Sequence, residues 1–130
     1  FGIAEDFYQS LAVPNKEDML IIRRVGVQLV VFVRLQGILK VDQVQAIISP
    51  LGLRFAGLWT LIQLNEQHPE FAHEHPHLTF YSEVGDSWFA AFHQEDGKVA
   101  RVMGLNDSKE WHGSYWWFAT EPVDVLPPKI

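Results

Sequence analysis

The sequence contains no cysteine, which excludes disulfide bridges, zinc–cysteine sites, iron–sulfur clusters and thiol nucleophiles. It is poor in basic residues: 10 Lys and Arg stand against 16 Asp and Glu, for a net charge of -6. This balance argues against binding to the phosphate backbone of nucleic acids. Its most apolar region, 20–39, is interrupted by Arg23, Arg24 and Arg34. Because charges at the centre of a membrane span are costly, we expect no transmembrane helix and no membrane partner.

Motifs of common catalytic sites are also missing. There is no Walker A or GxGxxG loop, no GxSxG nucleophile elbow and no HExxH zinc motif. Glu5 and Asp6 stand where a secretory signal needs basic residues, so we expect no signal peptide here and a cytoplasmic location. A leader removed upstream of Phe1 is the alternative. These absences favour a non-enzymatic protein without a resident cofactor.

What is present indicates one folded unit. The 130 residues are 48% hydrophobic and 13% aromatic, enough apolar surface to form a core. No stretch has the length or composition of a linker, and the chain has the size of one typical domain. We therefore predict a single compact domain over residues 1–130.

The first twenty-five residues indicate helices. Phe7, Tyr8 and Leu11 share one helical face over the segment 4–11, behind acidic residues that suit a helix N-terminus. Asn15 is a good N-cap, which predicts a second helix beginning near Lys16.

The rest of the first half is mixed. Apolar residues alternate over 26–35, which favours a strand, although a helix also aligns several of them. Asp42 predicts the start of a helix that Pro50 ends. The segment 53–64 fits either a helix or a strand interrupted at Gly57, and the pattern does not decide between them.

The second half indicates strands separated by turns. Gly85-Asp86 and Glu95-Asp96-Gly97 are turn sequences that divide apolar runs, which is typical of an antiparallel meander. Both faces of these runs carry aromatic residues, so neither face is expected to be fully exposed to water. Either the N-terminal half covers one face, and loops or a binding partner cover the other, or the sheet curls around a cavity. The predicted fold is therefore α+β, with helices mainly in the N-terminal half packed on an antiparallel meander of about four strands. The predicted strands are His77–Glu83, Ser87–Gln94, Lys98–Gly104 and Gly113–Thr120.

Charge is unevenly distributed along the chain. Residues 66–130 hold four Lys and Arg against eleven Asp and Glu, together with all six His and four of the five Trp. A concentrated negative field attracts basic partners, and Trp offers large rigid contact area. We therefore expect a protein-interaction module whose acidic, aromatic C-terminal half binds a basic protein. The predicted partner-binding residues are Asp86, Trp88, Glu95, Asp107, Glu110, Trp111, His112 and Trp116.

A histidine cluster supports an alternative function. His68, His73, His75 and His77 lie within ten positions, and imidazole is a common ligand of zinc and other transition metals. In an extended segment the last three would project from one face. The cluster therefore predicts a metal- or small-ligand-binding domain as the rival to protein binding. The same residues also fit a solvated or pH-responsive loop, and a small-molecule pocket between sheet and helices is a further alternative.

Overall fold

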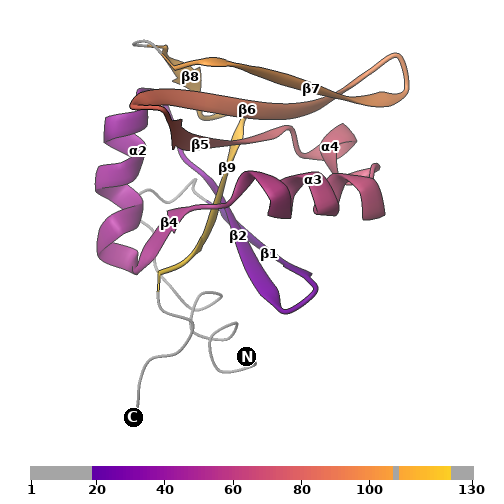
Figure 1. Ribbon diagram of the computed structural model, residues 1–130, viewed down its shortest axis with the longest axis horizontal. Helices are drawn as coiled ribbons and strands as arrows, with labels where there is room; N and C mark the ends of the chain where they lie inside the picture. Colours follow the sequence, from indigo (N-terminus) through magenta and orange to yellow (C-terminus); the bar gives the residue numbers. More distant parts are fainter. Residues whose placement is uncertain (1–18, 107–108, 124–130) are drawn as a thin grey trace.

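The computed structural model describes residues 19–106 and 109–123 (Figure 1). Of these residues, 50% are in strands and 25% in helices. In chain order the elements are β1 (Met19–Val25), β2 (Gln28–Arg34), β3 (Ile38–Leu39), α2 (Val41–Ile48), the 3-10 turn η1 (Ser49–Leu51), β4 (Leu53–Phe55), α3 (Leu58–Gln67), α4 (Phe71–Glu74), β5 (His77–Glu83), β6 (Asp86–Glu95), β7 (Lys98–Leu105), β8 (Trp111–His112) and β9 (Trp117–Pro122).

One large sheet organises the described residues. Six strands follow the order β1-β2-β9-β5-β6-β7, and β4 pairs with β9 as the seventh strand. All neighbours are antiparallel except β5 and β9, which run parallel. β3 and β8 form a separate two-stranded sheet. The prediction of a helical N-terminal half on a four-stranded meander is therefore wrong, because strands from both halves of the chain share one seven-stranded sheet with only three short α-helices.

The first half contributes strands where we expected a helix. The helix predicted over 4–11 lies outside the described residues, as does the expected helix start near Lys16. From Met19 onward, however, the chain is strand β1, which pairs along its whole length with β2. The two-residue turn between them uses Gly26 at φ 62°. The strand predicted from the alternation over 26–35 is confirmed as β2.

The two helical predictions in the middle of the chain are partly confirmed. The helix expected after Asp42 is α2, but its N-cap is Lys40, whose backbone N–H donates to the Gln43 side chain at 2.8 Å. The open segment 53–64 contains both alternatives in succession, strand β4 and then helix α3. Gly57 separates them as the extended N-cap of α3.

Three strands of the predicted meander are confirmed, and the fourth is not. β5, β6 and β7 are consecutive antiparallel neighbours, and positive φ angles at Gly85 and Gly97 make their turns. The predicted run 113–120 instead becomes a turn followed by β9, which lies between β2 and β5. All six residues of β9 are buried. Trp117 and Phe118 belong to the cores on opposite faces of the sheet, as expected of a strand whose two faces are both covered.

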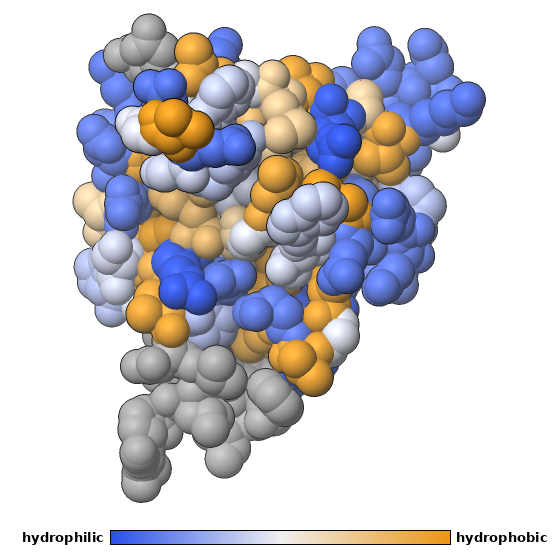
Figure 2. All heavy atoms as spheres, in the orientation of Figure 1, coloured by the Kyte–Doolittle hydropathy of each residue, from blue (hydrophilic) through white to orange (hydrophobic). Residues whose placement is uncertain are grey.

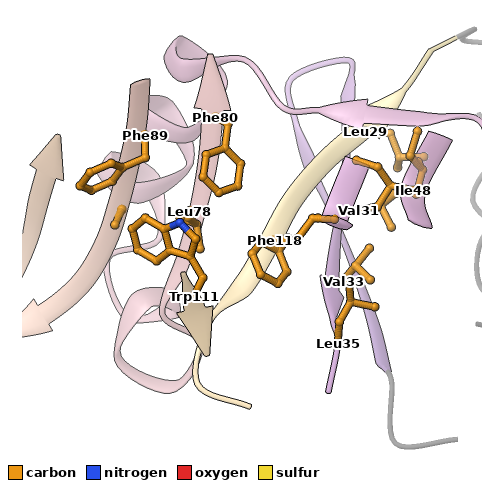
Figure 3. Close-up of a cluster of buried hydrophobic side chains, with 13 residues drawn as sticks. Leu29, Val31, Val33, Leu35, Ile48, Leu78, Phe80, Phe89, Trp111 and Phe118 are labelled. Carbon is orange, nitrogen blue, oxygen red and sulfur yellow. The ribbon is translucent and has the colours of Figure 1, made fainter. Parts of the chain in front are cut away.

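Each face of the sheet carries its own core. On one face, α2 and β8 cover strand residues that include Phe118, Phe80 and Phe89, with Trp111 of β8 packed between the last two (Figure 3). On the other face, α3 and α4 cover Phe32, Phe92 and Trp117. As expected, both faces of the sheet carry apolar side chains, and short helices and strands cover each face. The β3–β8 cover sits so close that a Cβ on Gly113 would collide with the Leu35 carbonyl.

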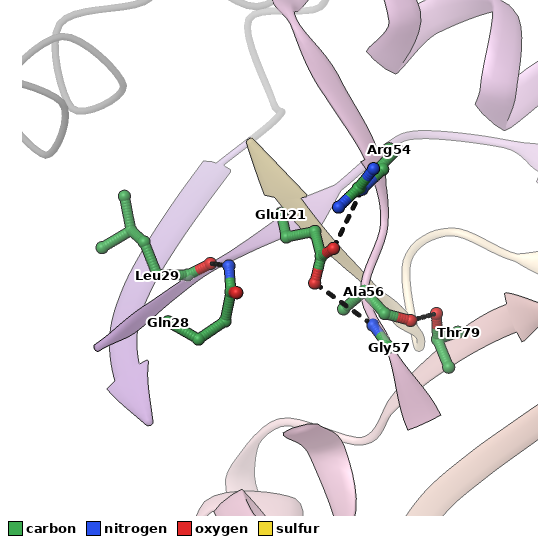
Figure 4. Close-up of polar contacts among 7 residues, drawn as sticks. All are labelled: Gln28, Leu29, Arg54, Ala56, Gly57, Thr79 and Glu121. Carbon is green, nitrogen blue, oxygen red and sulfur yellow. Dashed lines mark hydrogen bonds and ion pairs between the residues drawn. The ribbon is translucent and has the colours of Figure 1, made fainter. Parts of the chain in front are cut away.

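Polar contacts join β4 to the central strand. Arg54 Nε donates to a carboxylate oxygen of Glu121 at 2.9 Å, and the backbone N–H of Gly57 donates to the other oxygen at 3.3 Å (Figure 4). Thr79 of β5 donates its hydroxyl to the Ala56 carbonyl at 2.6 Å. These contacts hold the β4–α3 connection against β9 and β5. Nothing in the sequence pattern pointed to this ion pair, since its two residues are 67 positions apart in the chain.

Candidate binding surface at the sheet edge

Strand β7 is an exposed edge of the large sheet, and β1 is the strand at the opposite end of its order. β7 pairs with β6 on one side, and among the described residues no strand pairs with its other side (Figure 1). None of its eight residues is buried. Val102, Met103 and Leu105 are 46%, 43% and 49% exposed. Unpaired backbone groups beside exposed apolar side chains make an edge ready to pair with another chain.

The register shows which backbone groups are free to do so. The N–H of Asn106 donates to the Ser87 carbonyl at 2.8 Å, just beyond the last residue of β7. In an antiparallel ladder, successive residues point their N–H and C=O groups alternately toward and away from the neighbouring strand. Counting back from Asn106, the backbone groups of every second residue face away from β6. These residues are Leu105, Met103, Arg101 and Val99.

A row of larger side chains continues from this edge across the sheet. Leu105 lies opposite Trp88 of β6, and Trp88 lies opposite Tyr81 of β5. Trp88 is half-buried, and its indole Nε1 is shielded from solvent without a hydrogen-bond partner. Burial, followed by the nearby Glu83 carboxylate, raises the pKa of the Tyr81 phenol. The row gives the edge an aromatic and apolar flank on the face that α3 and α4 cover in part.

A hollow lies at one end of the edge. Its volume is about 340 Å³, and its lining includes Asp86, Ser87, Leu105 and Asn106. Asn106 is 7% exposed; its side-chain oxygen accepts from Trp111 Nε1 at 3.4 Å, while its Nδ2 has no partner. The hollow therefore offers an exposed carboxylate and a hydroxyl next to an apolar side chain, with the buried Asn106 in its wall.

Acidic residues mark both ends of the edge. Glu83 and Asp86 lie beside the hollow, and Glu95 and Asp96 lie at the tip of the β6–β7 hairpin. All four are exposed. Figure 2 shows the hydrophilic side chains gathered over this tip, at the upper right of the molecule. Because Asp86 and Glu95 are at opposite ends of β6, the predicted acidic surface is two separated groups and not one cluster.

The remaining predicted partner-binding residues lie in several environments. Trp111 is buried in the core, whereas Glu110 and His112 beside it are exposed. Trp116 is half-buried and contacts Trp111 edge to face, with ring centroids 5.6 Å apart. Asp107 lies outside the described residues. The structure therefore brings Asp86 and Trp88 to the exposed edge, and it uses Trp111 for packing.

The histidine cluster does not share one face. Helix α4 includes His73, so the expected extended run through residues 73, 75 and 77 is interrupted. His77 is fully buried: its Nδ1 donates to the His75 carbonyl at 2.8 Å, and its Nε2 accepts from Asn65 at 3.0 Å. Among residues 19–106 and 109–123, no three His, Cys, Asp or Glu side chains are grouped to hold a metal ion. His68 lies 3.7 Å from a Glu70 oxygen at the surface.

Burial lowers the pKa of two of these histidines, His77 and His75. His77 lies between Phe32, Phe71 and Phe92, with ring centroids 5.2–5.4 Å away. Desolvation lowers its pKa to about 4, so it is neutral at pH 7. His75 stacks on Phe71 at 4.7 Å, and desolvation lowers its pKa as well. The His77 ring thus lies in the core, and the half-buried His75 ring packs on Phe71 at its edge.

A second, smaller hollow of about 150 Å³ lies beside this cluster. Arg23, His68, His75 and Glu74 contribute to its lining, with Phe71 below. The Arg23 guanidinium lies over the Phe71 ring at 5.3 Å. Because two carboxylates and several basic groups line this hollow, it favours neither a cationic nor an anionic ligand. The lining of the hollow at the sheet edge, by contrast, has a carboxylate as its charged group.

Sequence reasoning did not identify β7 as an exposed edge strand. Val102, Met103, Leu105 and Asn106 were interpreted as parts of an ordinary strand and the loop after it. A weak signal existed: the run from Lys98 to Leu105 lacks the alternation of polar and apolar residues that a strand with one buried face shows.

Comparison with known proteins does not assign this chain to a family. The chain matches no protein-family model, and neither curated proteins nor solved structures yield a similar protein. Among the described residues, no helix combines the length and the apolar character that crossing a membrane requires.

Proposed function

We propose that this chain is a non-enzymatic protein-binding module, and that its binding surface is the edge formed by β7 and flanked by Trp88. The observation that carries the proposal is the strand itself: it has eight residues, none buried, and it presents three large apolar side chains beside an unpaired backbone. Exposed apolar surface next to aromatic groups is typical of protein-binding sites. The compartment we propose is the cytoplasm, with neither membrane nor nucleic acid as the partner.

The charge around this edge supports a basic partner. Asp86 lies at one end and Glu95 at the other, both exposed. Charges at the rim of an interface act mainly on the association rate and on its salt dependence. The acidic composition of the second half therefore assists encounter, while the apolar side chains of β7 hold the complex.

Site-specific photocrosslinking tests the proposal. A photoreactive residue replaces Leu105 in one variant and Trp59 in the control, which is 76% exposed on α3. In the cells that produce the protein, we expect a discrete crosslinked partner from position 105 that excess unlabelled protein competes away. The control position should not give it. Equal crosslinking from both positions, or none that competes, would overturn the proposed function.

A further inference from the structure

We infer that the partner binds β7 as an added strand: an extended segment with an apolar centre and basic ends, one of which places a Lys or Arg in the hollow beside Asp86. This inference rests on the proposed function and specifies its binding mode. The free groups of Val99, Arg101, Met103 and Leu105 are spaced as only an extended backbone can match. A helix or a compact loop would leave most of these groups unpaired.

The side chains of the edge define the centre of the segment. Met103 and Leu105 point to the same face as Trp88, and Val102 points to the other. Alternate residues of an added strand would therefore pack on Met103 and Leu105, while the residues between them would lie near Val102. Apolar or β-branched residues suit both faces, because cross-strand pairs of such residues stabilise a ladder.

The charges define its ends. The exposed Asp86 carboxylate lines the hollow, so it can accept hydrogen bonds from an ammonium or guanidinium group placed there. At the other end Glu95 and Asp96 are exposed; Lys98 lies opposite Glu95, which leaves Asp96 to attract a cation of the segment. Arg101 in the middle of β7 disfavours a basic residue at the centre of the segment.

The same charges disfavour a second copy of this chain. Antiparallel pairing of β7 with its own copy would bring the hairpin tip of one molecule to the hollow of the other. Glu95 and Asp96 of one molecule would then lie toward the end of the joint that holds Asp86 of the other, although both β7 strands would separate them. Acidic groups on both sides of an interface repel each other at long range, whereas a segment with basic ends is attracted to them.

Amide hydrogen exchange on the full chain tests this mode of binding. The probe is a synthetic peptide of alternating Thr and Val, matched in length to β7, with Lys at both ends. At millimolar peptide we expect slower exchange, on the order of tenfold, at the amides of Val99, Arg101, Met103 and Leu105. The amides of Ala100 and the other inward-facing residues should change little, because they already face β6.

Matched variants separate pairing from general stabilisation. Met103→Pro removes one outward N–H at a position where an edge strand tolerates proline, so the protein should fold while protection disappears. Met103→Thr keeps the N–H and should retain protection. Asp86→Asn should weaken binding of the Lys-ended peptide, and a peptide with Glu at both ends should bind more weakly to the unmodified protein.

Three outcomes would overturn the inference. They are protection without alternation along β7, no protection with any peptide, and protection that appears without peptide as protein concentration rises, which would identify a second copy as the occupant. If the crosslink from position 105 persists in any of these cases, the proposed function stands and only the added-strand mode fails. Loss of that crosslink overturns both.

Discussion

Strands β9 and β7 are both rich in apolar residues, yet all six residues of β9 are buried and none of the eight in β7 is. β9 has strands on both sides and covering elements on both faces, whereas β7 has one neighbour and lies beyond most of that cover. The same kind of side chain therefore forms the core in one strand and surface in the other. The position of a strand in the sheet, and not its composition, decides which role it plays.

Truncation of one large side chain in each strand should give the largest contrast. Phe118 of β9 is fully buried, so Phe118→Ala should lower the free energy of unfolding by about 3–5 kcal/mol. Val102→Ala on β7 should change it by about 0.5 kcal/mol or less, because the site is half exposed. Urea unfolding of the two variants measures both values. Equal losses would mean that β7 is covered in solution and would break the comparison.

The sequence predicted local structure better than the arrangement of strands. The alternation over 26–35 and the turns at Gly85 and Gly97 identified β2 and the β5–β6–β7 meander, because these signals act over a few residues. The insertion of β9 between β2 and β5 depends on pairing between distant segments, which no local pattern records. Asp86 and Trp88 could be predicted as partner-binding residues from local charge and aromatic content. The exposure of β7 depends on its place at the end of the strand order, which no local pattern records.

The surroundings of β9 should also make stability depend on pH. His77, which lies opposite Trp117 of β9, has a pKa of about 4 in the folded protein. A histidine in the unfolded chain has a pKa near 6.5, so between these values the unfolded state binds more protons. Its contribution is complete above about pH 6.5, falls as the pH drops toward 4, and amounts to about 3 kcal/mol over the whole window.

Urea unfolding between pH 7 and pH 4 measures this effect. The control is His77→Gln, which is less stable at pH 7 but lacks the buried imidazole, so its stability should fall less steeply. An identical slope for the two proteins would assign the pH dependence to other groups. No histidine lies within β7 itself, so this pH dependence would distinguish the surroundings of β9 from the edge strand.

An intermediate effect is expected at the polar end of β9. Glu121→Ala removes the acceptor for the Gly57 backbone N–H and for Arg54, which should cost about 1–3 kcal/mol. Arg54→Ala should cost less, because the arginine side chain is 61% exposed and solvent screens the pair. Thermal unfolding of both variants gives the order. A larger loss for Arg54→Ala would show that packing of the arginine stem, and not the carboxylate, holds β4.

The smallest change in stability is expected from a charge placed on β7. Met103→Lys should alter the free energy of unfolding by about 0.5 kcal/mol or less, since the side chain is partly solvated already. It should also raise the protein concentration at which aggregation begins, because lysine on an edge strand opposes unwanted strand pairing. Chemical denaturation and light scattering measure the two effects. Natural edge strands often carry such charges; β7 has Arg101 near its middle, followed by the exposed Val102, Met103 and Leu105. If Met103→Lys destabilised the fold as strongly as a core substitution, the edge would be part of the core, and the contrast with β9 would disappear.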